Sequence, residues 1–328
     1  MLTFVIRRIV IIIPLMILIS LITFVIIQLP PGDYLTTYIN NLRASGTELD
    51  EAQIQALVSQ FGLDRPFYEQ YYRWISNIVL HGNLGWSFQW NSSVNEVLAE
   101  RLPVTVALSL ASLVVVWIVA IPIAIISATH QYSVFDYFFT FLGFIGIATP
   151  SFLLALIAVW MLYSVTGYTV TGLFAKEFLG AAWSWAKFCN MMSNAWLPIM
   201  IVAVAGTAGL IRVLRATLLD ELRKQYVITA RSKGLTERRV LFKYPIRIAM
   251  NPIFSTIGWL LPSLVSGQVI VAIVLNLQTV GPVLLRATLA QDMYLTGSIV
   301  LILSSLTVIG TFISDLLLAW LDPRIRLG

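Results

Sequence analysis

The sequence predicts an all-α membrane protein with six transmembrane helices, because composition, hydropathy and charge distribution all favour this fold class. Of the 328 residues, 58 % are hydrophobic and only 11 % are charged, whereas soluble domains are about half apolar and about a quarter charged. The mean hydropathy is +0.85 and the pI is near 9.4. In a soluble protein such a pI would suggest nucleic acid binding, but basic residues also accumulate in the cytoplasmic loops of membrane proteins. We therefore expect membrane lipids, and not nucleic acid, around this chain.

Six stretches of the chain are apolar enough and long enough to cross a bilayer, which takes about 20 helical residues. They are residues 9–29, 103–128, 137–163, 196–218, 250–275 and 296–320. The first follows Arg7 and Arg8, as the apolar part of a secretory signal would. Its apolar run is too long for a signal and no small-residue cleavage site follows. We expect it to remain as the first membrane helix.

The lysines and arginines between these spans predict the orientation of the chain. One side of the membrane receives fourteen of them, ten of which lie between Arg212 and Arg247, and the other side receives seven. Cytoplasmic loops carry the excess of positive charge. The sequence therefore predicts a multi-pass protein of the inner (plasma) membrane, with both termini and the 212–247 segment in the cytoplasm.

The first extracytoplasmic segment, residues 30–100, carries signals for several helices. The amphipathic stretch "DEAQIQALVSQFG" stops at Gly62, and a second helix is predicted to begin near Pro66 and to stop at Gly82. The letters "SVNE" at Ser93–Glu96 fit a capping box, in which Ser and Glu side chains satisfy free backbone N–H groups. We expect a small helical cap on the outer side.

A second outer insertion spans residues 164–195. It contains Tyr168, Trp183 and Trp185. Tyrosine and tryptophan gather at membrane–water interfaces, so an interfacial aromatic belt is the simpler interpretation. Contact with a partner protein or a solute is the alternative.

Ionisable residues are nearly absent from the predicted spans, and Asp315 is the clearest exception. A carboxylate inside a membrane usually indicates function. Asp315, however, precedes Asp322 by only seven residues, about 10 Å along a helix. We expect it to pair with Arg212 or Arg215 near the inner surface. An ion-coupled carrier usually needs ion sites near the middle of the membrane, so the scarcity of charge disfavours a carrier, although polar groups and carbonyls alone can bind Na⁺.

Proline and small residues interrupt three of the spans. The stretches are "ATPS" at 148–151, "AGTAG" at 205–209 and "LLPSLVSGQ" at 260–268. Proline frees a carbonyl and permits a bend, which membranes tolerate where protein or a water-filled cavity covers it. Small residues allow helices to pack closely. Five polar residues in these stretches are candidates for lining a solute pathway, or else for bonding a neighbouring helix: Thr149, Ser151, Ser263, Ser266 and Gln268.

Signatures of enzymes and metal sites are missing from the sequence. It contains no HExxH, GxSxG or GxxxxGK[ST] motif. Its two histidines, His81 and His130, have no cysteine or carboxylate cluster at metal-ligand spacing beside them. We expect no catalytic residues, no metal and no cofactor in this chain, and ordinary polar roles for both histidines.

The basic segment from Arg212 to Arg247 predicts two short helices that meet at a turn. Good helix formers without proline run up to Gly234, where glycine offers the left-handed conformation that ends a helix. Thr236 is placed to cap a second helix, "ERRVLFK", which Tyr244–Pro245 ends. An exposed turn of this kind suits a groove on another protein, and a basic cushion on anionic lipid headgroups is the alternative.

This segment resembles the cytoplasmic "EAA" loop of ABC-importer permeases. By the general pattern of that loop only Ala230 and Gly234 match, but "YVITARSKGLTERRVLFKYPIR" is similar almost throughout to the dipeptide/oligopeptide branch. The resemblance covers nearly the whole chain. It also includes "RRIVIIIPLMILISLITFVI", "FGLDRPFYEQYYRWI", "RLPVTVALSLAS" and "LLLAWLDPRIR".

The resemblance implies the fold of type I ABC importers and a division of the chain into three parts. These are the first helix at 1–29, the outer segment at 30–100 and a core of five helices at 101–328 with a coupling loop at about 219–247. The implied partners are a second homologous permease, two ABC ATPase subunits that bind ATP and Mg, and an extracytoplasmic solute-binding protein. The implied ATPase-coupling residues are Tyr226, Ala230, Arg231, Lys233, Gly234, Leu235, Glu237, Arg238 and Arg239.

The expected solute is an oligopeptide or an oligosaccharide. Many peptide permeases have an acidic residue and then Pro-Gly around the fifth helix, where this chain has Ala272 and then Gln278–Thr279. The stretch "LNLQTVGPVLLRA", and "AQDMYL" with Ala290 in place of Ser, resemble oligosaccharide-type members of the branch. Apart from an importer, the sequence leaves open an ion-coupled carrier, a membrane enzyme and a structural scaffold. A channel is disfavoured because the chain has no ring of pore-lining charges.

Overall fold

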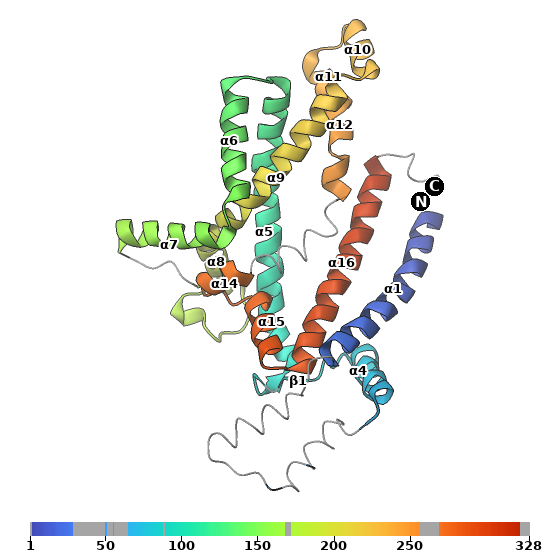
Figure 1. Cartoon of the computed structure of the whole chain (residues 1–328), viewed down its shortest axis with the longest axis vertical. Coiled ribbons are helices and arrows are strands. Elements are labelled where there is room, and N and C mark those ends of the chain that lie inside the picture. Colours follow the sequence, from blue (N-terminus) through green and yellow to red (C-terminus); the bar gives the residue numbers. More distant parts are fainter. Residues whose placement is uncertain are drawn as a thin grey trace. The chain divides into compact units, whose positions relative to one another are not determined.

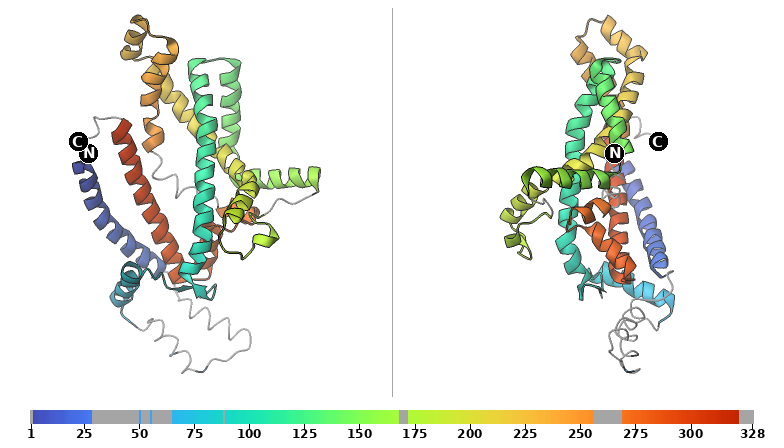
Figure 2. Two further views of the ribbon diagram at one scale, coloured as in Figure 1. Left: turned by 180° about the vertical axis from the view of Figure 1, so that it is seen from behind. Right: turned by 60° about the vertical axis from the view of Figure 1, so that its left-hand side comes forward.

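The computed structural model describes residues 2–28, 50, 55, 65–87, 89–167, 172–255 and 269–321, almost all of them in helices. Four of these helices are long and apolar enough to cross a membrane, and a bent pair of helices adds a fifth span if it is counted as one. The chain divides into two compact units. One comprises residues 105–278 and 309–328, and the other comprises residues 2–104 and 279–308. Figures 1 and 2 show the elements of each unit.

The unit that contains the N-terminal helix also holds the described part of the segment that follows it and the start of the last long helix. Its elements are α1 (Leu2–Gln28), α4 (Phe67–His81), β1 (Trp86–Ser87), β2 (Ser92–Ser93), the start of α5 (Val94–Thr129), α15 (Val280–Leu289) and the start of α16 (Met293–Leu321). The two antiparallel strands are a small departure from the all-α prediction. Helix α4 lies beside α1, where Trp74 is buried against Phe24 with ring centroids 5.7 Å apart.

The predicted limits of α4 are confirmed. Pro66 occupies the N-cap position, and Gly82 follows the last residue with φ of 63° in the left-handed region. Its N–H donates to the carbonyl of Ile78, as expected of a helix that ends at glycine. Helix α5 begins at Val94, as the "SVNE" signal predicts, but the hydrogen bond that Glu96 accepts comes from Ser92 Oγ and is not that of the predicted capping box. The helix predicted to end at Gly62 lies outside the described residues.

A buried carboxylate, Asp292, ties the strand pair to the start of α16. Its side chain is fully buried and accepts hydrogen bonds from Ser87 Oγ at 2.6 Å, from the Gln89 N–H at 3.1 Å and from the Leu295 N–H at 3.2 Å. Asp292 therefore joins two segments that lie far apart in the sequence, residues 87–89 and the start of α16.

We expect Asp292→Ala to destabilise this unit by about 3 kcal/mol, because a buried hydroxyl and two N–H groups lose their acceptor. The melting temperature of the purified protein in detergent measures the loss. Asp292→Asn keeps one acceptor oxygen and should lose less. An unchanged melting temperature in the alanine variant would show that these bonds add nothing to stability.

The other unit carries the remaining spans. Its elements are the rest of α5, α6 (Val134–Ala148), α7 (Ser151–Thr166), η1 (Lys176–Phe178), α8 (Trp185–Asn194), α9 (Trp196–Leu222), α10 (Gln225–Ser232), α11 (Glu237–Lys243), α12 (Pro245–Ala249), α14 (Val269–Val274) and the end of α16. Helices α1, α5, α9 and α16 match four of the predicted spans. The fifth predicted span, 250–275, is helical at 251–255 and 269–274, and residues 256–268 lie outside the described part.

The predicted span over 137–163 consists of two helices that meet at Pro150, within the stretch where the sequence permits a bend. The chain bends by 102° between α6 and α7, and Figure 1 shows the change of direction. The break lies at Thr149 and Pro150, where Thr149 has extended backbone angles of −91° and 121°. Proline has no N–H to continue the helical ladder and disfavours helical angles in the residue before it. The "ATPS" stretch therefore ends one helix and begins another.

Close packing at "AGTAG" is confirmed. A Cβ on Gly206 would lie 3.0 Å from Val116 of α5, and Ala208 lies on the side of α9 that faces α6. There, a Cβ on Gly146 would lie 3.3 Å from the Cβ of Ala208. Small residues thus let α9 approach both α5 and α6.

The described part of the 164–195 insertion folds around a lysine. Lys187 on α8 is buried, and its ammonium group lies 5.1 Å from the ring centroid of Phe174 and 5.2 Å from that of Trp183. It also donates to the carbonyl of Ala181. Trp185 is 78 % exposed, so an outward aromatic side chain remains for either a membrane interface or a partner. Tyr168 lies outside the described residues.

Candidate functional site

The basic segment after α9 forms a hairpin of two short helices, α10 and α11, and we call residues 225–243 the basic hairpin. The sequence predicts that the first of these two helices runs up to Gly234 without a break. This is wrong, because α9 ends at Leu222 and Lys224 is extended, with ψ of 147°, before α10 begins. The Tyr226 hydroxyl donates to Glu221 and so connects α10 to the end of α9. Burial, and then this carboxylate, raise the pKa of the Tyr226 phenol well above its usual value.

The turn of the basic hairpin is built on Gly234, as the sequence predicts. Gly234 has φ of +76°, and its N–H donates to the carbonyl of Arg231 at 2.9 Å. Few residues other than glycine adopt this left-handed conformation. Thr236 does occupy the N-cap position of α11, but its side chain makes no capping hydrogen bond, so that detail of the prediction is wrong. Helix α11 ends before Tyr244, and Pro245 opens α12.

The basic hairpin has an apolar core of its own. Val227, Ala230 and Val240 are buried, and Tyr226, Leu235 and Tyr244 pack against them. Three of the predicted coupling residues, Tyr226, Ala230 and Leu235, therefore shape the hairpin from within. This core holds α10 against α11 and leaves the other predicted residues on the outside.

The outer surface of the basic hairpin is cationic and carries two apolar side chains. Lys233, Arg238 and Arg239 are exposed, while Phe242 is 65 % and Ile228 is 47 % exposed. Phe242 is not among the coupling residues that the sequence predicts. Its spacing of four residues from Arg238 on one helix is the signal that points to it, since residues four apart share a face. A surface that mixes arginine with an exposed aromatic is typical of protein interfaces.

An ion pair crosses the turn of the basic hairpin. Arg231 donates from Nε and from a terminal nitrogen to the two carboxylate oxygens of Glu237, at 3.1 and 2.6 Å. The guanidinium holds the pKa of Glu237 below its usual range. The side chains are 43 % and 57 % exposed, so water and salt screen the pair, and its contribution is at most about 1 kcal/mol.

We expect Glu237→Gln to speed amide hydrogen exchange in α10 and α11 only roughly twofold at pH 7, as a screened pair implies. A carboxyl whose pKa is lowered in the folded state adds stability above its unfolded pKa and loses it as pH falls through the folded value. The variant and the wild type should therefore converge below about pH 4. A tenfold or larger effect at pH 7 would contradict a screened pair.

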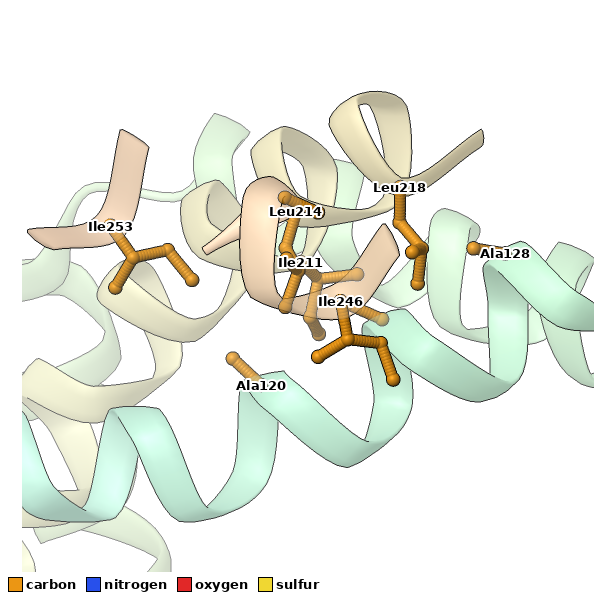
Figure 3. Packing of buried hydrophobic residues seen from close by; sticks show 9 residues of the cluster. Ala120, Ala128, Ile211, Leu214, Leu218, Ile246 and Ile253 are labelled. Carbon is orange, nitrogen blue, oxygen red and sulfur yellow. The ribbon is translucent and has the colours of Figure 1, made fainter. Parts of the chain in front are cut away.

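An apolar cluster anchors the basic hairpin to the membrane helices, and Figure 3 shows it. Ile211, Leu214 and Leu218 of α9 pack against the small residues of α5 and against α12. The members on those two elements are Ala120, Ala124 and Ala128 of α5 and Ile246 and Ala249 of α12, with Ile253 beyond. Because α9 leads into α10 and α12 follows α11, both ends of the hairpin are fixed to one cluster.

A second anchor is an ion pair that the sequence analysis missed. Arg215 of α9 donates to both carboxylate oxygens of Asp136, each at 2.7 Å. Asp136 is buried in the first turn of α6 and also accepts from the N–H of Tyr132 at 3.0 Å. Arg215, one of the two partners predicted for Asp315, thus pairs with Asp136 instead, and that part of the prediction is wrong. Asp136 and Arg215 lie 79 residues apart in the sequence, and no local pattern connects them.

The candidate pathway residues are only partly described. Thr149 and Ser151 flank Pro150 at the bend between α6 and α7, and Thr149 Oγ1 donates to the carbonyl of Ile145 at 2.8 Å. Ser263, Ser266 and Gln268 lie outside the described residues. Among the residues that the structure describes, no group of three or more metal-binding side chains occurs. His81 and His130 lie at the ends of α4 and α5, as expected of ordinary polar residues.

Comparisons with known proteins agree with this architecture. Residues 120–327 match the model of the "Binding-protein-dependent transport system inner membrane component" family, and residues 1–109 match the model of its N-terminal part. The chain is 33 % identical to the oligopeptide transport system permease protein AppB of Bacillus subtilis (strain 168), over 99 % of this chain and 100 % of that protein. It is 28 % identical to the dipeptide transport system permease protein DppB of Escherichia coli (strain K12), over 99 % of both chains.

A putative peptide permease protein of Brucella suis biovar 1 is 30 % identical, again over 99 % of both chains. These likenesses cover 99 % of the chain, including every segment that resembles the dipeptide/oligopeptide branch. They also agree with helices long and apolar enough to cross a membrane. The chain therefore belongs to the family of inner-membrane components of binding-protein-dependent transport systems, and it is a permease subunit of an ABC importer rather than an enzyme.

Proposed function

We propose that this permease subunit carries oligopeptides, and that its basic hairpin is the surface on which an ATPase subunit docks. In the proposed complex a second homologous permease completes the pathway, two ABC ATPase subunits bind ATP and Mg, and an extracytoplasmic protein delivers the solute. ATP-driven movement of the hairpin switches the pathway between inward-open and outward-open.

The observation that carries this proposal is the construction of the basic hairpin. It has its own core, its Gly234 turn is exposed, and both of its ends are anchored to the same cluster of α5, α9 and α12. A push on the exposed surface would therefore be transmitted to membrane helices instead of being absorbed by a loose loop. A cushion on lipid headgroups would need the charges but not this rigid attachment.

The proposed topology has six spans, with both termini and the basic hairpin in the cytoplasm. Its support is the excess of fourteen over seven Lys and Arg residues on that side. Helix α4 and the insertion around α8 then lie outside the cytoplasm, where the solute-binding protein docks. Thr149 and Ser151, with Ser263, Ser266 and Gln268, are the proposed polar contacts along the pathway.

An oligopeptide is preferred to an oligosaccharide because the relatives named above are peptide permeases by name. The experiment is uptake by the complete transporter in proteoliposomes, with its own solute-binding protein outside and labelled peptides or oligosaccharides as solutes. We expect ATP-dependent uptake of peptides only. Uptake of oligosaccharides that peptides do not compete for would overturn the peptide assignment, and a thermal-shift screen of the solute-binding protein gives an independent reading of its ligand.

A further inference from the structure

Helices α6 and α9 are fixed to each other at two points, one near each end of α6. At the first turn of α6, Asp136 receives both hydrogen bonds of the Arg215 fork. At the last turn, Gly146 lies so close to Ala208 that a Cβ would come within 3.3 Å of it. The two helices also pack against each other. They are therefore held as a pair.

The ion pair at the first of these points fixes geometry more than it supplies stability. The planar guanidinium meets the carboxylate in two parallel hydrogen bonds, which set both distance and orientation. The Asp136 side chain is 3 % exposed, and the Tyr132 N–H and the Ser133 hydroxyl hold the start of α6 around it. Well-packed apolar residues of similar volume stabilise a buried site as well as an ion pair does, so stability alone gives no reason for the charges.

The position of the pair links the basic hairpin to the bend at Pro150. Arg215 precedes Leu222, the last residue of α9, by seven residues, about 10 Å along the helix. Beyond that point α10 begins, and at the far end of α6 the chain turns by 102° into α7. A displacement of the hairpin thus has a continuous route of fixed elements from α9 to α6 and on to α7.

We propose that Asp136 and Arg215 are positioning residues that make α6 move together with α9 when an ATPase displaces the basic hairpin. The inference rests on the proposed docking of the hairpin. The new claim is that α6 receives the motion, together with α7 beyond the bend. Without the pair, α9 would follow the hairpin while α6 would lag behind.

The test uses the complete transporter in proteoliposomes and measures uptake and ATP hydrolysis per assembled complex. Asp136→Ala and Arg215→Ala should lower uptake roughly tenfold, as expected when a coupling network is broken, while ATP hydrolysis persists. Arg215→Lys keeps the charge but not the two parallel hydrogen bonds, so its uptake should lie between that of the alanine variants and that of the wild type. The double variant D136L/R215M removes the fork while keeping a packed site and should also be uncoupled. Arg212→Ala, an exposed arginine one turn away on α9, is the matched control.

A distance measurement separates positioning from folding. Spin labels at the exposed positions Tyr137 of α6 and Val213 of α9, in a Cys189→Ser background, report the spacing of the two helices. We expect one narrow distance with and without ATP in the wild type, and a broad or ATP-dependent distance in D136L/R215M.

Unchanged uptake in D136L/R215M, a narrow distance in that variant, or a parallel loss of uptake and hydrolysis would overturn the proposal. If Gly234 variants remain uncoupled in the same assay, the docking of the basic hairpin stands even so. Uptake that needs no ATPase subunit would instead overturn the proposed function itself.

Discussion

Replacing Gly234 with valine should lower solute uptake at least about tenfold while ATP hydrolysis by the partner subunits continues. Gly234 has φ of +76° and no atom within 4 Å of where a Cβ would lie, so the substitution acts through backbone strain and not through a clash. The left-handed conformation costs L-residues about 1–2 kcal/mol, and about 1.4 kcal/mol is tenfold in an equilibrium. The turn would relax and displace α10 from α11, although the membrane helices stay folded.

Two control variants show whether the loss of uptake comes from backbone strain and whether the strain must lie in the basic hairpin. Gly234→Asn should retain most uptake, since asparagine adopts the left-handed conformation more readily than other residues. Gly82→Val places valine at another left-handed glycine, φ +63°, with no atom within 4 Å, so it carries similar strain outside the basic hairpin and should leave coupling intact. Equal uptake in Gly234→Val and wild type would refute the role of the turn.

Reversing two charges, in R238E/R239E, should weaken binding of the ATPase subunits roughly 100-fold. Both side chains are exposed on α11, near the exposed ring of Phe242. Like charges brought together in an interface cost several kcal/mol, and 2.8 kcal/mol is about 100-fold. The loss should be measured as ATPase retained by the purified permease, at several salt concentrations, because exposed charges are screened by salt.

The matched control for this reversal is R7E/R8E, two arginines at the start of the chain and outside the basic hairpin. It should retain the ATPase subunits. Binding of each variant to anionic vesicles tests the lipid cushion. Weaker vesicle binding by R238E/R239E, with ATPase retention unchanged, would favour the cushion over the docking surface.

Local signals predict the small elements of this chain well. Pro66 and Gly82 set the limits of α4, and Gly234 sets the turn between α10 and α11. Each depends on the backbone preferences of one residue and its nearest neighbours, which the sequence states directly. The predicted coupling residues accordingly come together in one hairpin.

Features that depend on distant parts of the chain are harder to predict. Proline predicts a bend between Thr149 and Ser151, but no local signal gives its angle of 102°, because α7 packs on α9 and α14, which lie far away in the sequence. Good helix formers run through Arg223 and Lys224, yet the hairpin core and the Tyr226–Glu221 bond break the helix there. The pairing of Asp136 with Arg215 is equally hard to predict, since the two residues lie 79 apart in the sequence and no local pattern connects them.

The most direct test is solute uptake by proteoliposomes that hold the complete transporter, compared with proteoliposomes that hold the permeases alone. With the solute-binding protein outside, uptake should require both ATP and the ATPase subunits, and an ionophore that collapses ion gradients should not change it. Uptake by the permeases alone, or uptake that the ionophore abolishes while ATP depletion leaves it intact, would contradict an ATP-driven importer and favour an ion-coupled carrier.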